Sequence, residues 1–71
     1  MDKYEFNIKV EQIKKLVNKG DYETAMKIAD TIDWRRVRST SLLTTIAQVY
    51  ERNAEYQDAK DILLLAFERA P

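Results

Sequence analysis

The stretch that decides the fold is residues 41–71, SLLTTIAQVYERNAEYQDAKDILLLAFERAP. Its apolar residues recur every three or four positions, which is the spacing of one face of an amphipathic α-helix. The pattern breaks at Asn53, a residue type that tolerates the left-handed conformation found where helices end. The stretch therefore predicts two helices joined by a short turn, and helices joined this closely pack antiparallel.

The same pattern recurs upstream at a fixed interval. Tyr56 and Ala59 have counterparts 34 residues earlier, at Tyr22 and Ala25. An offset of this size in helical sequence indicates a helix-hairpin repeat. The alanines also predict close approach of neighbouring helices, because a larger side chain would push the helix axes apart.

The whole chain is expected to be all-α. Asp2, Asp21 and Asp33 are suited to cap the N-termini of helices, and Gly20 is suited to end one. Four helices are expected over residues 3–19, 21–32, 34–52 and 55–69, the last ended by Pro71. Residues 36–40 are the weakest part of the third helix, because serine and threonine compete for its backbone hydrogen bonds, and the sequence is equally compatible with a break or an alternative start there.

Composition narrows the classes of function. The chain has 71 residues, enough for a single domain over residues 1–71. It has no Cys and no His, so it lacks thiolate ligands, disulfides and the usual general base. No Gly-rich elbow or phosphate loop surrounds the remaining nucleophiles. We therefore expect no enzyme activity, no catalytic residues, no metal site and no cofactor.

Charge and hydropathy bear on partners and location. The 12 basic and 12 acidic residues give zero net charge, which favours neither a polyanion nor a polycation as partner. The longest apolar run, residues 62–67, is far shorter than the roughly 20 residues of a membrane span. The N-terminal residues do not form a signal peptide. We expect a cytoplasmic protein without a membrane partner.

The second hairpin resembles the tetratricopeptide repeat (TPR), a 34-residue helix hairpin with the pattern W-x2-L-G-x2-Y…A-x3-F…P. Every position of that pattern is filled here, at the right spacing, by a residue that keeps its size or its apolar character. These residues are Leu43, Ile46, Ala47, Tyr50, Ala59, Leu63 and Pro71. Tyr50 and Tyr56 match core positions of the family.

The first hairpin matches the family less well. Its turn and second helix fit at Gly20, Tyr22 and Ala25, but Lys9 and Gln12 stand at the Trp and Leu positions. The resemblance implies a right-handed stack of two antiparallel hairpins, a TPR-like α-solenoid fragment. Residues 3–33 would be a degenerate first repeat and residues 40–71 the second. We expect this to be the N-terminal part of a longer repeat protein, because about three repeats are needed for stability.

The resemblance also implies a function, which is non-catalytic binding of a peptide or protein partner. In the family, the first helices of successive repeats line a groove that takes a peptide. The groove positions implied here are Asn7, Val10, Lys14, Val17, Ser41, Thr44, Gln48 and Arg52.

The last helix supports a second hypothesis, self-association into a homo-oligomer. It is apolar nearly all round, which is typical of a buried helix, yet two hairpins cannot cover both of its sides. We expect Leu64, Leu65 and Phe67 to meet either a following repeat or a second copy of the chain.

A third and weaker hypothesis is RNA binding through Arg35, Arg36 and Arg38, which follow Trp34. Because the chain is neutral overall, we favour a structural interpretation. In that interpretation Trp34 packs where the hairpins join, the arginines pair with carboxylates such as Asp33, and nucleic acid is not the partner.

Overall fold

The computed structural model describes residues 2–70, and these residues form an all-helical fold without a strand. The all-α class is therefore as predicted. The α-helices of the described residues are α1 (Lys3–Lys19), α2 (Tyr22–Ala29), α3 (Thr40–Arg52) and α4 (Tyr56–Arg69), and a 3₁₀ turn lies at Trp34–Arg36. Pro71, the residue predicted to end the last helix, lies outside the described residues.

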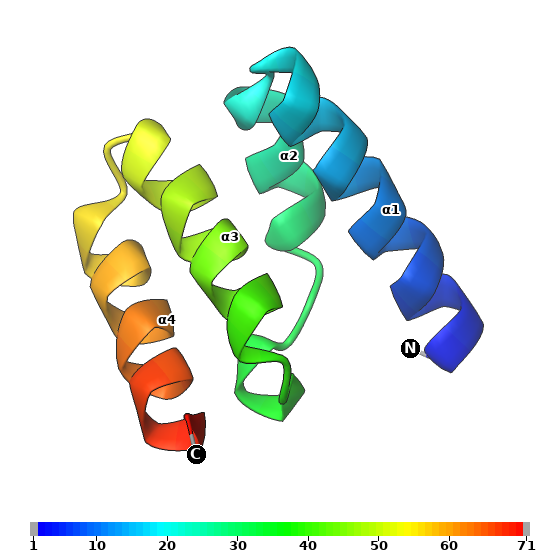
Figure 1. The fold of residues 1–71 in the computed structure, drawn as a ribbon. Coiled ribbons are helices and arrows are strands. Elements are labelled where there is room, and N and C mark those ends of the chain that lie inside the picture. Colours follow the sequence, from blue (N-terminus) through cyan, green and yellow to red (C-terminus); the bar gives the residue numbers. More distant parts are fainter. Residues whose placement is uncertain (1, 71) are drawn as a thin grey trace.

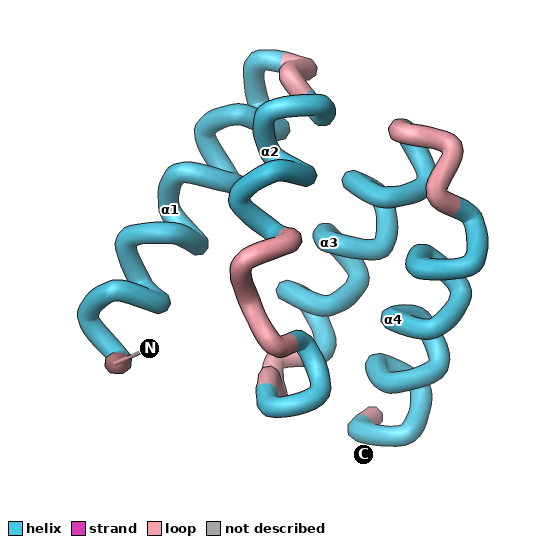
Figure 2. Tube along the Cα trace, turned by 180° about the vertical axis from the view of Figure 1, so that it is seen from behind, coloured by secondary structure: helices cyan, strands magenta, loops and turns pink. Residues whose placement is uncertain are grey.

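The four helices alternate in direction and lie side by side in chain order (Figure 1). The view from behind shows α2 between α1 and α3, with the loop after α2 crossing to the start of α3 (Figure 2). The most extensive contact is between α3 and α4, followed by α1 with α2 and then α2 with α3. The result is a slab of 29 × 29 × 18 Å.

The predicted helix caps at the first hairpin are confirmed. The Asp2 side chain accepts a hydrogen bond from the Glu5 backbone N–H at 2.7 Å, and Asp21 accepts one from Thr24 at 3.2 Å. The bond from the Thr24 backbone lowers the pKa of Asp21, because it stabilises the ionised carboxylate. Gly20 ends α1 in the left-handed conformation, with φ of 80°.

The predicted start of the third helix at residue 34 is wrong. Trp34–Arg36 forms the 3₁₀ turn, residues 37–39 are not helical, and α3 begins at Thr40. Asp33 caps the turn, and the Ser39 hydroxyl caps α3 by accepting the Leu42 backbone N–H at 3.2 Å. The weak helix formers of this segment therefore make a real break, because the Ser39 side chain replaces a helical hydrogen bond.

Helix α2 also ends earlier than predicted, at Ala29 instead of residue 32. The indole N–H of Trp34 donates to the Ala29 carbonyl at 3.0 Å, and Ile32 N–H donates to the same oxygen at 3.1 Å. A continued α-helix would give that carbonyl to residue 33. Trp34 thus anchors the connection against the end of α2.

A single hydrophobic core joins all four helices, and Ile13, Leu43, Ile46 and Val49 are its largest fully buried side chains. Ala25 and Ala59, the alanines predicted to lie at helix contacts, are buried, as are Ala29 and Ala47. Tyr50 is buried as predicted. The prediction that Tyr56 lies in the core is wrong, because it begins α4 on its outer side and is 67% exposed.

The turn between α3 and α4 differs in one residue from the prediction. The left-handed residue is Ala54, with φ of 61°, and Asn53 has φ of −97°. The Asn53 amide donates to the Val49 carbonyl at 2.7 Å and to the Tyr22 carbonyl at 2.9 Å. Asn53 therefore ends α3 through its side chain and ties the second hairpin to the first.

Candidate partner-binding surfaces

Four polar residues form one exposed row along α3. They lie three, four and four positions apart, so they share the side of the helix opposite the core. They are Ser41, Thr44, Gln48 and Arg52. The Arg52 guanidinium lies 5.3 Å from the centre of the Tyr22 ring, an arrangement that favours a cation–π contact and holds this end of the row against α2.

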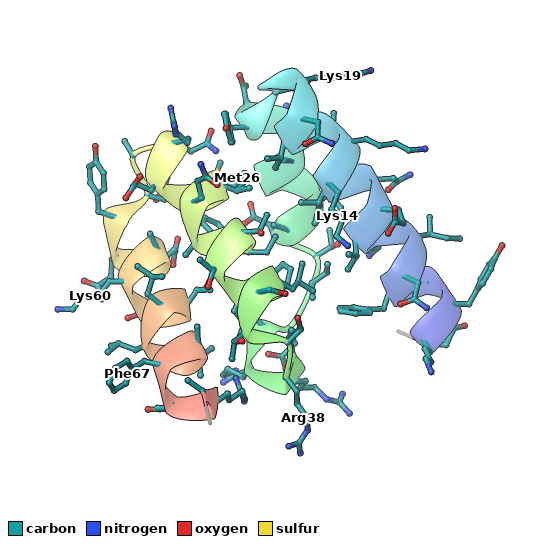
Figure 3. All side chains as sticks on the ribbon, in the orientation of Figure 1. Lys14, Lys19, Met26, Arg38, Lys60 and Phe67 are labelled. Carbon is teal, nitrogen blue, oxygen red and sulfur yellow. The ribbon has the colours of Figure 1, made fainter. Side chains whose placement is uncertain are left out.

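Helix α1 contributes fewer residues than predicted. Asn7 and Lys14 are exposed, and Lys14 lies on the side of α1 toward α3 (Figure 3). Val10 is buried, and Val17 is half-buried against the core. Both belong to the apolar stripe that packs α1 onto the rest of the fold, so neither presents a surface to a partner. The predicted groove positions that are exposed are therefore Asn7, Lys14 and the row on α3, and we call these positions the candidate groove between α1 and α3. Asn7 also lines a hollow formed by α1 residues alone, among them Tyr4 and Gln12.

A pocket of about 640 Å³ lies at the end of this groove where α1 and α3 begin. Its walls come from the first turns of α1, the connection after α2 and the first turn of α3. Its apolar lining is Phe6, Ile32, Val37 and Leu42, and its polar lining is Lys3, Asp33, Arg36, Arg38 and Ser39.

Sequence reasoning missed this pocket because it placed residues 34–52 in one helix. The available signal was the alternation in Arg36-Val37-Arg38, which is the period of extended backbone and not of a helix. In the structure Val37 is buried while the two arginines on either side of it are exposed.

The structural interpretation of the arginine cluster holds for Trp34 and Arg35 but not for Arg36 and Arg38. Trp34 is buried, and the Arg35 Nε lies 3.2 Å from the Asp33 carboxylate. The Arg35 side-chain hydrogen bond lowers the pKa of Asp33. Arg69, in the last turn of α4, donates to the Arg35 backbone carbonyl. Arg35 is thus held on the α4 side, whereas Arg36 and Arg38 line the pocket.

A second hollow, on the α4 side of the connection, is acidic. It includes Asp30, Asp58 and Asp61 beside Tyr50. The Tyr50 hydroxyl donates to Asp30 at 2.6 Å, and burial together with this bond raises the pKa of Tyr50. Across residues 2–70, no group of three or more acidic side chains is arranged to hold a metal ion.

The outer side of α4 carries an exposed apolar patch. Phe67 is 82% exposed and Leu64 is 52% exposed, as the self-association hypothesis requires. The prediction that Leu65 belongs to this patch is wrong, because Leu65 is half-buried against the core. Leu63 and Tyr56 take its place, and we call Tyr56, Leu63, Leu64 and Phe67 the outer α4 face. Figure 3 shows Phe67 and Lys60 projecting from this edge of the molecule.

Comparison of the chain with protein-family models, with curated proteins and with solved structures gave no match. In the part of the chain that the structure describes, no helix is both long enough and apolar enough to cross a bilayer.

Proposed function

We propose that the chain is a non-catalytic protein–protein interaction module of the TPR type. Its two hairpins would stack as a right-handed α-solenoid fragment, and the groove between α1 and α3 would receive a peptide or a segment of a partner protein. The observation that supports this best is the two-sided character of α3: one side is exposed and polar, and the other is buried at Leu43, Ile46 and Tyr50.

A rigid, polar helix surface suits peptide binding for a physical reason. The backbone under the row on α3 is fixed by core packing, so little conformational entropy is lost on the receptor side when a partner binds. Arg52, placed by the Tyr22 ring, adds a cation to the groove, whereas the Lys14 ammonium lies 3.8 Å from the Glu11 carboxylate. Because hydrogen bonds at a wet polar surface contribute little each, we expect modest affinity from this chain alone.

The test is selection of peptides from a random display library, followed by NMR mapping of each selected peptide on the isotope-labelled protein. Chemical shifts should move at Asn7, Lys14, Thr44, Gln48 and Arg52. Shift changes confined to the outer α4 face, or a library that yields no binder, would contradict the proposal.

A matched pair of variants sharpens the test. Gln48→Ala removes a hydrogen-bonding side chain from the groove, and Gln57→Ala removes the same group from an exposed position on α4. Loss of one hydrogen bond to the peptide should weaken binding about fivefold in the first variant and leave it unchanged in the second.

A second candidate function, self-association, is favoured by the exposure of Phe67 and Leu64. Burying such side chains against a second copy would gain roughly 1.5–3 kcal/mol each. Sedimentation equilibrium should then show a dimer that Leu64→Ser with Phe67→Ser dissociates and Tyr4→Ser, an equally exposed apolar site on α1, does not. A monomer at millimolar concentration would rule out self-association and leave the groove proposal intact.

A further inference from the structure

The pocket at the end of the groove combines an apolar floor with a cationic rim. Ile32, Val37 and Leu42 are each more than nine-tenths covered by the protein and form the floor, together with half-buried Phe6. The volume of about 640 Å³ falls within the range of ligand-binding pockets, about 300–1,000 Å³.

The charges around this floor are unbalanced. Lys3, Arg36 and Arg38 all line the pocket, and within residues 2–70 none of them has a carboxylate oxygen within 4.0 Å. The acidic residue of the lining, Asp33, accepts hydrogen bonds from the backbone and side chain of Arg35. The rim therefore offers three cations to a ligand, in a chain whose net charge is zero.

We propose that this pocket sets the specificity of the groove, by taking large apolar side chains of a partner peptide that are flanked by aspartate or glutamate. This inference rests on the proposed function, because the pocket continues the groove between α1 and α3. The apolar side chains would enter between Phe6 and Leu42, and the flanking carboxylates would pair with Arg36 and Arg38. Arginine suits this role because its planar guanidinium can bind a carboxylate through two parallel hydrogen bonds.

The same geometry argues against RNA as the occupant. Single-stranded RNA is usually held by bases stacked on exposed aromatic rings. Trp34 is buried with its N–H bonded to Ala29, and the aromatic residue of the pocket, Phe6, is half-buried. An apolar floor gives no partner to the polar edges of a base, whereas it matches a leucine or phenylalanine side chain.

The experiment uses three fluorescein-labelled peptides of equal length as probes: DDLFEE, KKLFKK and DDSSEE. Fluorescence anisotropy should show that DDLFEE binds about tenfold more tightly than either of the others, since only it supplies both apolar side chains and carboxylates. Its affinity should also fall as NaCl is raised, because partly exposed charge pairs are screened.

Variants then locate the site. Arg36→Gln with Arg38→Gln should weaken DDLFEE binding about tenfold, because both carboxylate partners are lost. Lys19→Gln with Lys60→Gln removes the same two positive charges away from the pocket, at the end of α1 and on the edge of α4, and should leave binding unchanged. Circular dichroism of each variant checks that the helices are retained.

The proposal would be overturned by equal binding of DDLFEE and KKLFKK, by an effect of the Lys19→Gln, Lys60→Gln control as large as that of the Arg36→Gln, Arg38→Gln variant, or by tight binding of labelled oligouridylate that the arginine variant abolishes. Dissociation of a dimer by the arginine variant would also overturn it, because a second copy would then be the occupant. If library-selected peptides still shift Gln48 and Arg52 while DDLFEE does not bind, this specificity is wrong and the proposed function stands.

Discussion

Ala54 is the residue with the least favourable backbone among residues 2–70, since it is the non-glycine residue there that holds a positive φ, 61°. In this conformation the Cβ of an L-residue approaches the following carbonyl oxygen. The turn needs it nonetheless, because Ala54 and Glu55 N–H groups close the end of α3 on the carbonyls of Glu51 and Tyr50.

Replacing Ala54 with glycine should therefore stabilise the protein. Ala54→Gly removes the strain of the left-handed backbone in the folded state but increases the conformational entropy of the unfolded chain. The free energy of unfolding should rise by about 0.5–1 kcal/mol. The midpoint of urea unfolding measures it. Gly20→Ala is the reverse substitution, at a residue whose φ is 80°. Among the described residues no atom lies within 4 Å of the added Cβ, so the substitution adds only backbone strain. It should cost about 1 kcal/mol. A destabilised Ala54→Gly variant would contradict this account.

Tyr50 joins α3 to the end of α2 through its hydrogen bond to Asp30. Tyr50→Phe removes the bond and should cost about 1 kcal/mol of unfolding free energy at neutral pH. Because burial raises the pKa of Tyr50, the folded protein keeps the phenol proton at pH values where the unfolded chain loses it. The stability due to Tyr50 is therefore complete below about pH 10 and declines above it.

The pH dependence separates Tyr50 from the other titrating groups. The free energies of unfolding of the wild type and of Tyr50→Phe, measured in urea, should differ less at about pH 11 than at about pH 8. Lysines and the other tyrosines are common to both proteins, so they cancel in this comparison. A difference that is constant, or that grows, with pH would contradict the assignment.

At the scale of elements, helix starts differ in how they are capped. The side chains of Asp2, Asp21 and Ser39 each accept a backbone N–H at the start of their helix. Glu55, the N-cap residue of α4, makes no such bond within the described chain. The helix without a side-chain cap, α4, thus takes part in the most extensive helix contact of the fold, the one with α3.

A shorter side chain at this position should supply the missing cap. Glu55→Asp keeps the charge and places the carboxylate within reach of the first N–H groups of α4, so it should stabilise the protein by about 0.5–1 kcal/mol. Ser39→Ala removes an existing cap and should cost about 1 kcal/mol. Thermal unfolding followed by circular dichroism checks both. If Glu55→Asp lowers the melting temperature, the start of α4 is limited by something other than its cap.

The elements also show what could be predicted from sequence. The bounds of α1 and α4 follow from apolar spacing and from local residues such as Asp2 and Gly20, and the prediction was right to within a residue. The break at residues 34–39 depends on Trp34 bonding to Ala29, a contact between segments that periodicity does not report. The alternation in Arg36-Val37-Arg38 indicates extended backbone there but does not give the pocket, because its walls meet only along the path that the Trp34 contact sets for this connection. Val10 was assigned to the groove by family register, although its own apolar stripe placed it in the core.

On the scale of the whole molecule, the two hairpins are unequally supported. Helix α2 has eight residues, and its contact with α3 is smaller than the contact between α3 and α4. The links from the first hairpin to the second include the bonds of Asn53 to Tyr22 and of Tyr50 to Asp30. We therefore expect α1 and α2 to open together while α3 and α4 remain folded, since local openings follow the weakest interface.

Native-state hydrogen exchange with two matched variants tests this order. Ile13 in α1 and Ile62 in α4 are both buried, at 0% and 5% exposure, and Ile→Val should cost about 1 kcal/mol at either site. Ile62→Val raises the free energies of the native state and of the partly open state equally, because Ile62 is packed in both. Exchange should therefore stay unchanged in α1 and α2 and accelerate about fivefold in α3 and α4, which exchange through global unfolding. Ile13 loses its packing both when α1 and α2 open and when the whole protein unfolds. Ile13→Val should therefore accelerate exchange in all four helices. Acceleration of α1 by Ile62→Val would instead mean that the hairpins unfold as one unit, and that the interface between α2 and α3 is as strong as the hairpins it joins.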